Sequence, residues 1–577
     1  MSNKASFFEI PLVVVTGVSA MVLSRTHGTG LQPYGADSAQ YIEHLTRMET
    51  LEFWRDPGLS TLQFLALADG AFPPLLHLLT LMLGPLIGSS AQEVLWTGLL
   101  WLLLLAISVA VVVSSVAASR QAGVAAFCGV MLIPALHGAA CRYYYDLPMT
   151  ALLWAATAVA CFGLTRRPLR YGVLAGLFLF AANLVKWTAL PFGLIMIAAV
   201  SLGQLVEGSS HQSRGWRNSL LGALVAVSVM SCGSLLFIKA MGPNDSFTAM
   251  LGEIGTTAAH GGPAGVDSAS AQGVLAGVFA RFEAPTAARL AFYPSRLLAS
   301  IYSPLLLAPV LLLLGVWWRS GRRGWTLVAA VLLGQWLFLL VRVPPLDDRF
   351  LLTAAPALVI PAAIGWVSLQ ARLRMVTAAL VLVAGFAVGL DFHFRDSPAL
   401  RSVAPTLDRP ERLGEILRWG LADSVDQRGW ARRSSQADDR APLREALWAQ
   451  LRHCRAQHFR LAADDPLVGD AGDVYWLRYR TLYAHLKEGE VKRTVPPICN
   501  EVPAGDTQLA LSGYPRGAKP VRPRCIAAEQ GWGLERSIEL PGLKRGVAVW
   551  SLNGGQVCAA LATELDAAES SLDSPQQ

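Results

Sequence analysis

Apolar runs of about 20 residues recur along the first two thirds of this chain, and they limit its possible folds more than any other feature. A transmembrane helix needs about 20 apolar residues, because the hydrocarbon core offers its backbone no hydrogen-bond partner. Only 15% of the 577 residues are charged, whereas soluble proteins carry about 25%. The pattern predicts a polytopic α-helical membrane domain over residues 1–391 and a water-exposed domain over 392–577.

Eleven segments have the length and composition of membrane spans. The first is interpreted as a retained helix because it lacks a clear small-x-small cleavage site. A twelfth apolar stretch, 73–87, is shorter and opens with Pro73 and Pro74. The eleven predicted spans cover 7–23, 93–118, 121–138, 148–164, 171–186, 189–206, 218–240, 297–318, 325–341, 350–368 and 375–391.

Short basic clusters between the apolar runs predict the orientation. Cytoplasmic loops carry the excess of Lys and Arg. If 73–87 does not cross the membrane, the basic loops 166–170, 319–323 and 372–374 fall on the cytoplasmic side with the N-terminus. We therefore expect 73–87 to lie at the outer surface or to re-enter the membrane. A net charge of +7 distributed in this way fits a plasma-membrane protein better than a nucleic-acid-binding one.

This orientation places the long loops and the C-terminal part outside the cytoplasm. The outer segments are 24–92, 139–147, 241–296, 342–349 and everything after 392. Long loops in compact membrane domains are usually functional. The C-terminal part is predicted to be a small α/β or α+β domain, with a strand at 547–551 and helical spacing at 413–419 and 443–451.

Four cysteines lie in the predicted outer domain. They could form two disulfides with three possible connectivities, or remain four independent thiols. No C-x-x-C spacing indicates a zinc site. These cysteines are Cys454, Cys499, Cys525 and Cys558.

Ionisable and aromatic residues gather in the outer segments beside the spans. Charged groups at membrane depth are costly and often functional. Each position also has a structural interpretation, such as helix capping by an acid, a satisfied buried histidine, an interfacial aromatic belt or a lysine that snorkels. The candidates are Asp37, Tyr41, His77, Arg142, Tyr145, Asp146, Lys186 and Arg349.

Several short motifs occur in a characteristic order. Asp37 is followed by Tyr41, and a Phe-Pro-Pro-Leu-Leu-His segment covers 72–77. Asp146 precedes Leu-Pro, a Gly-containing helix ends at Lys186, and Arg349 opens an Arg-Phe-Leu-Leu segment. With these motifs residues 1–391 resemble the GT-C superfamily of polyprenyl-phosphate-sugar-dependent glycosyltransferases, which includes protein O-mannosyltransferases and the bacterial lipid A aminoarabinose transferase. The sequence departs from the family pattern by Phe at 72 and 350, where the family often has His and Tyr.

The resemblance implies a mechanism at the outer face of the membrane. A sugar would pass from polyprenyl phosphate to a hydroxyl or phosphate of a lipid, glycan or protein acceptor, with inversion. Asp37 would act as general base and Asp146 would orient a substrate, so both are predicted to be catalytic. Lys186 and Arg349 would bind the phosphate. The remaining substrate-binding candidates are Tyr41, His77, Arg142 and Tyr145.

No cofactor is certain from the resemblance, and a divalent metal ion held by Asp37 and Asp146 stays an open alternative. Three other functions also remain open. They are a transporter or flippase, a non-catalytic envelope assembly protein, and a ligase that transfers whole glycans from diphosphate carriers. A transporter would favour repeated topology and charges near the midplane. No repeat is evident, and the candidate charges lie at the outer boundary.

Overall fold

The chain forms two compact units in the computed structural model. Predicted span 7–23, Asp37, Arg142 and the four cysteines of the C-terminal part lie outside the described residues. The described residues are 41–42, 45–46, 73–88, 91–140, 143–207, 213–241, 290, 293–294, 297–302, 304–321, 323–342, 348–394, 459–461, 509–515, 517–522, 531–539 and 545–552.

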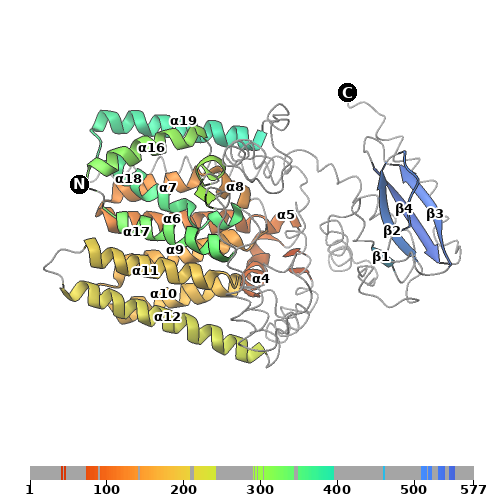
Figure 1. Cartoon of the computed structure of the whole chain (residues 1–577), viewed down its shortest axis with the longest axis horizontal. Coiled ribbons are helices and arrows are strands. Elements are labelled where there is room, and N and C mark those ends of the chain that lie inside the picture. The colour runs from red at the N-terminus through yellow and green to blue at the C-terminus, as the bar shows by residue number, and fades with distance from the viewer. Residues whose placement is uncertain are drawn as a thin grey trace. The chain divides into compact units, whose positions relative to one another are not determined.

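The first unit is a bundle whose long helices lie side by side (Figure 1). Within the described residues, five helices are long and apolar enough to cross a membrane. The prediction of a polytopic helical membrane protein is therefore confirmed, while the count of eleven spans stays a prediction. The five helices are α6 (Thr97–Ala117), α9 (Asp146–Gly163), α10 (Pro168–Val185), α11 (Ala189–Glu207) and α12 (Ser213–Met241).

Three predicted spans are interrupted in the structure. Segment 121–138 forms α7 (Arg120–Met131) and α8 (Pro134–Ala140), because Pro134 has no N–H and disfavours helical geometry in the residue before it. Segment 297–318 opens with a π-helical turn, η1 (Leu297–Ile301), before α16 (Pro304–Arg319). Segment 350–368 begins with two 3-10 turns, η2 (Asp348–Leu351) and η3 (Ala355–Leu358), and continues as α18 (Val359–Val367). The bundle is completed by α17 (Trp325–Arg342) and α19 (Ala371–Phe394). Residues 91–93 of the short helix α5 (Ala91–Val94) belong to the second unit.

Small residues bring α10 close to α12. A Cβ added at Gly172 would lie 2.6 Å from the carbonyl oxygen of Gly222, and one at Gly176 would lie 2.7 Å from that of Ala226. Glycines four residues apart occupy one helix face and let two backbones approach within the membrane. The contact fixes the position of α10, whose C-terminal end carries Lys186.

Helix α4 (Leu75–Ile87) lies at one end of the bundle (Figure 1). It begins after the Pro73–Pro74 pair, which suits a first turn because those backbone groups have no helical acceptor. Leu76, His77, Thr80 and Leu81 are buried, whereas Met82 is 62% exposed and Leu86 83%. An apolar exposed side suits contact with lipid, and the predicted surface or re-entrant placement of this segment stays a prediction.

The second unit contains a four-stranded sheet with the order β1-β2-β4-β3. Strands β1 (Phe459–Leu461) and β2 (Leu509–Pro515) are parallel, and β4 (Arg545–Leu552) pairs antiparallel with both β2 and β3 (Trp532–Glu539). The predicted strand at 547–551 lies within β4. The helical patterns at 413–419 and 443–451 lie outside the described residues, and the domain boundary at 391 stays a prediction.

Candidate functional site

The two ends of the helical bundle differ in their polar residues. Helices α9 and α10 are consecutive and joined by a short turn, so the beginning of α9 and the end of α10 share one end. The start of α6 lies there too, because a Cβ at Gly98 would meet the carbonyl of Ala140. We call this the Asp146 end. The opposite end, where α6 ends and α7 begins, is called the arginine end after its exposed side chains, Arg120, Arg319, Arg323 and Arg372.

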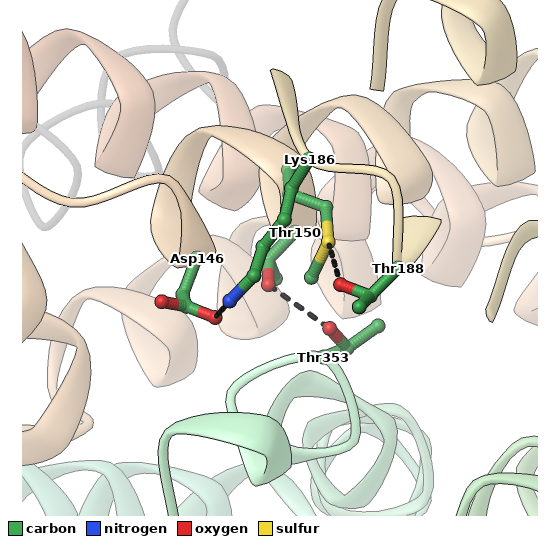
Figure 2. Close-up of polar contacts among 6 residues, drawn as sticks. Asp146, Thr150, Lys186, Thr188 and Thr353 are labelled. Atoms are coloured by element: carbon green, nitrogen blue, oxygen red, sulfur yellow. Dashed lines mark hydrogen bonds and ion pairs between the residues drawn. The ribbon is translucent and has the colours of Figure 1, made fainter. Parts of the chain in front are cut away.

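An ion pair joins the ends of α9 and α10. The Nζ of Lys186 donates to the Oδ1 of Asp146 at 2.8 Å (Figure 2). The Asp146 side chain is 5% exposed and that of Lys186 19%. Asp146 lies in the first turn of α9 and Lys186 immediately follows α10. Because helix dipoles favour anions at the N-terminus and cations at the C-terminus, both helices stabilise the pair.

This geometry argues against the structural interpretations of both residues. Tyr145, and not Asp146, occupies the N-cap position of α9, and the Tyr145 side chain makes no capping hydrogen bond to that helix. Lys186 adopts extended backbone geometry after α10, and its ammonium group turns to the buried carboxylate. The lysine is therefore held within the protein and does not simply extend toward water.

Phe350 lies beside the ion pair, and the preceding residue, Arg349, lies against Tyr144. The Nζ of Lys186 is 5.3 Å from the centre of the Phe350 ring, and the guanidinium of Arg349 is 5.6 Å from that of Tyr144. Both are distances at which an aromatic face attracts a cation. The structure thus brings Asp146, Lys186 and the segment of Arg349 together, which follows the sequence interpretation that placed them on one face.

Two hydrogen bonds fix the segment that follows Arg349. The hydroxyl groups of Thr150 and Thr353 are 3.1 Å apart, and the indole Nε1 of Trp154 donates to the Thr353 carbonyl at 3.0 Å (Figure 2 shows the threonine pair). Thr150 follows Asp146 by one helical turn, so both face the same side of α9. That spacing was the available sequence signal for Thr150, whereas nothing in the sequence pointed to Thr353.

His77 is completely buried and joined to the loop before Asp146. Its Nδ1 lies 3.1 Å from the Tyr143 hydroxyl and its Nε2 2.7 Å from that of Tyr145. Tyr143 donates to Thr80 at 3.0 Å, and Thr80 donates to the carbonyl of Leu76. Tyr143 therefore accepts from a protonated Nδ1, because each hydroxyl has one hydrogen. Burial also raises the pKa of Tyr143 above its usual range, which keeps this phenol neutral.

This network supports a structural role for His77, which clamps α4 to the Tyr143–Tyr145 loop. The substrate-binding role predicted for His77 and Tyr145 stays a prediction. Tyr41 belongs to the second unit, and Asp37 and Arg142 lie outside the described residues, so their predicted roles are also unchanged.

The described donor groups do not form a metal site. Within the part of the chain that the structure describes, no three His, Cys, Asp or Glu side chains gather around a common point. The carboxylate of Asp146 is already bonded to a lysine, which competes with a metal cation. Metal binding by Asp37 with Asp146 remains a prediction, because Asp37 is not described.

Comparison with known proteins places this geometry in a known fold. No family model and no curated protein sequence matches the chain. The crystal structure of ArnT from Cupriavidus metallidurans bound to undecaprenyl phosphate matches with a TM-score of 0.55 and 14% identity, over 93% of this chain and 97% of ArnT. Its apo form matches with a TM-score of 0.53, the same identity and the same coverage. The chain has the GT-C fold.

This fold is the one that the ordered motifs of residues 1–391 indicated, so the resemblance is confirmed at the level of structure. The archaeal oligosaccharyltransferase AglB from Archaeoglobus fulgidus, in complex with an inhibitory peptide and a dolichol-phosphate, also matches. Its TM-score is 0.44 and its identity 12%, over 86% of this chain and 65% of AglB.

Proposed function

We propose that the chain is a membrane glycosyltransferase that moves a sugar from a polyprenyl-phosphate donor to a hydroxyl or phosphate acceptor. The observation that carries the proposal is the buried Asp146–Lys186 ion pair, with Phe350, the residue after Arg349, beside it, at one end of a GT-C bundle. The ArnT structure with the same fold was solved with undecaprenyl phosphate, which supports a lipid-phosphate ligand.

Lys186 and Arg349 are proposed to bind the donor phosphate. The acceptor oxygen would attack the anomeric carbon while the bond from that carbon to the phosphate oxygen breaks. Negative charge then grows on the departing polyprenyl phosphate, and fixed cations stabilise it. A fixed cation stabilises a transition state without reorganisation, so holding Lys186 in place matters as much as its charge.

Asp146 is proposed to position Lys186. Its carboxylate bonds directly to the ammonium group and is almost fully buried. In the donor complex it would also orient the sugar or the acceptor. Asp37 is proposed to take the acceptor proton, and a single displacement of this kind inverts the anomeric centre. Tyr41, Arg142 and Tyr145 are proposed substrate contacts.

The proposal includes an orientation. The Asp146 end faces away from the cytoplasm and the arginine end faces the cytoplasm, as the excess of basic residues predicts. An activated lipid donor needs no ATP, which suits a reaction outside the cytoplasm. A flippase is less well supported, because the described charged cluster lies at one end of the bundle.

Binding of polyprenyl phosphate tests the proposal without knowledge of the sugar, since this lipid is the common product. Purified full-length chain should bind undecaprenyl phosphate, and Lys186→Met should weaken binding about tenfold or more, as expected for loss of a charge-assisted contact. Arg217→Gln is the matched control, because Arg217 is an exposed basic residue near the start of α12 at the arginine end.

Turnover is tested by the lipid-linked sugars themselves. Cells that lack the gene should accumulate one polyprenyl-phosphate sugar and lose one envelope glycan modification by mass spectrometry. Equal binding by wild type and Lys186→Met would remove the phosphate-site assignment. Unchanged lipid-linked sugars would remove the transferase assignment.

A further inference from the structure

A cavity lies in the bundle, between α7, α16, α18 and α19. Its volume is about 410 Å³, within the range of roughly 300–1,000 Å³ typical of small-ligand sites. Apolar side chains line nearly all of it, from Leu132, Tyr302 and Val359 toward one end to Trp366 and Arg374 at the other. Met375 lines the cavity and is 66% exposed, so the cavity opens along the face of α19 that points away from the bundle.

The cavity runs along the bundle and begins at the arginine end. Both Gln121, near the start of α7, and Leu132, just after its end, line the cavity. At a rise of about 1.5 Å per residue these positions are roughly 16 Å apart. One leaflet of the hydrocarbon core is about 15 Å thick, half of about 30 Å. The length of the cavity therefore matches one extended acyl chain in one leaflet.

A single cation occupies the polar end of this apolar cavity. The Nη1 of Arg374 donates to the Oε1 of Gln121 at 3.0 Å. Its Nε is buried and has no hydrogen-bond partner among the described residues. The side chain nevertheless lines the cavity, and a guanidinium has five N–H donors, so its remaining N–H groups can donate to an anionic acceptor in the cavity.

Neighbouring side chains place this cation at the membrane–water interface. The indole of Trp366, which also lines the cavity, donates to the Arg374 carbonyl at 2.8 Å, and tryptophans concentrate at that interface. Exposed Arg319, Arg323 and Arg372 add positive charge at the same end. Basic pockets between helices on the cytoplasmic side bind anionic lipid headgroups.

We propose that this cavity binds an anionic phospholipid of the leaflet at the arginine end. One acyl chain lies between α7 and α19, and the headgroup phosphate accepts hydrogen bonds from Arg374. The site is separate from the proposed donor site, because it lies toward the opposite end of the bundle from Lys186.

Lipid retention by the full-length chain tests this site independently of sugar transfer. The chain is exchanged into bilayer discs of equal parts phosphatidylglycerol and phosphatidylcholine, released, and examined by native mass spectrometry. Wild type should retain phosphatidylglycerol about tenfold more than phosphatidylcholine. Arg374→Gln should lose that preference, whereas Arg372→Gln, an exposed arginine two residues away that does not line the cavity, should keep it.

A second variant tests the acyl-chain part of the site. Ala378→Trp fills the cavity and leaves Arg374 in place, so retention of both lipids should fall. Wild-type lipid retention in both Arg374→Gln and Ala378→Trp, with normal elution as a folded protein, would overturn the proposal. An equal loss of the phosphatidylglycerol preference in Arg372→Gln and Arg374→Gln would also overturn it, because that result would indicate general attraction of anionic lipid to the basic surface. Displacement of phosphatidylglycerol by added undecaprenyl phosphate would assign the cavity to the donor instead.

Discussion

The Asp146 end and the arginine end of the bundle contain similar residue types in opposite physical settings. At the Asp146 end the charged side chains of Asp146 and Lys186 are largely buried and bonded to each other. At the arginine end Arg120, Arg319, Arg323 and Arg372 are exposed. A buried charge must be compensated by specific partners, whereas an exposed charge is stabilised by water.

The two settings correspond to two different roles of charged side chains in a membrane protein. Exposed arginines bias the orientation of the chain, and their exact positions matter little. A buried ion pair depends on geometry, and loss of one member leaves the other without compensation. Arg374 lies between these cases, because it belongs to the arginine end but has a buried Nε. The following changes test how far the two ends differ.

Asp146→Asn should give the largest effect, because it leaves the Lys186 ammonium beside a neutral amide. Breaking a buried pair costs about 3 kcal/mol or more. The free energy of unfolding in detergent should fall by about that amount. Asp146→Asn combined with Lys186→Met should recover part of the loss, as a double-mutant cycle measures. If the double variant lost as much unfolding free energy as the two single variants together, the two charges would not interact and the two ends would be alike.

Gly176→Ala should lower the free energy of unfolding by about 2 kcal/mol. The new Cβ would lie 2.7 Å from the Ala226 carbonyl, so α10 would have to move away from α12. Lys186, just after the end of α10, should then pair less well with Asp146. Gly315→Ala in α16 is the matched control, since nothing lies within 4 Å of its added Cβ. Equal stability of the two variants in thermal unfolding would contradict close packing between α10 and α12.

His77→Phe should lower the free energy of unfolding by about 1–2 kcal/mol, because an aromatic ring is kept while the hydrogen bonds to Tyr143 and Tyr145 are lost. Thr80→Val changes only the far end of the same network and should cost less. Thermal unfolding of both variants measures the difference. A larger loss for Thr80→Val would mean that His77 does not clamp this loop, and it would favour the substrate-binding role predicted from the sequence.

The sequence predicted the helical class, the GT-C fold and the location of Asp146, Lys186 and Arg349 on one face of the bundle, because each of these follows from local patterns and their order. It did not predict the break at Pro134 within an apolar run, or the 3-10 turns before α18, since hydropathy measures composition and not helix continuity. The bond between Thr150 and Thr353 joins residues that are 203 positions apart, and only tertiary packing brings them together. Helix propensity cannot reveal such a contact.

Among the four predicted variants, Glu207→Ala should lower the free energy of unfolding least, although it removes an acid from the arginine end. The Glu207 carboxylate accepts from the backbone N–H of Gly324 at 2.6 Å and of Thr326 at 3.0 Å, so it caps the start of α17 from the end of α11. Loss of a helix cap costs about 1 kcal/mol, and Glu207 is exposed, so water can replace part of its role. The loss should shrink in high salt, because salt weakens exposed electrostatic contacts. A loss as large as that of Asp146→Asn in unfolding measurements would show that exposed charges at the arginine end are also fixed by geometry.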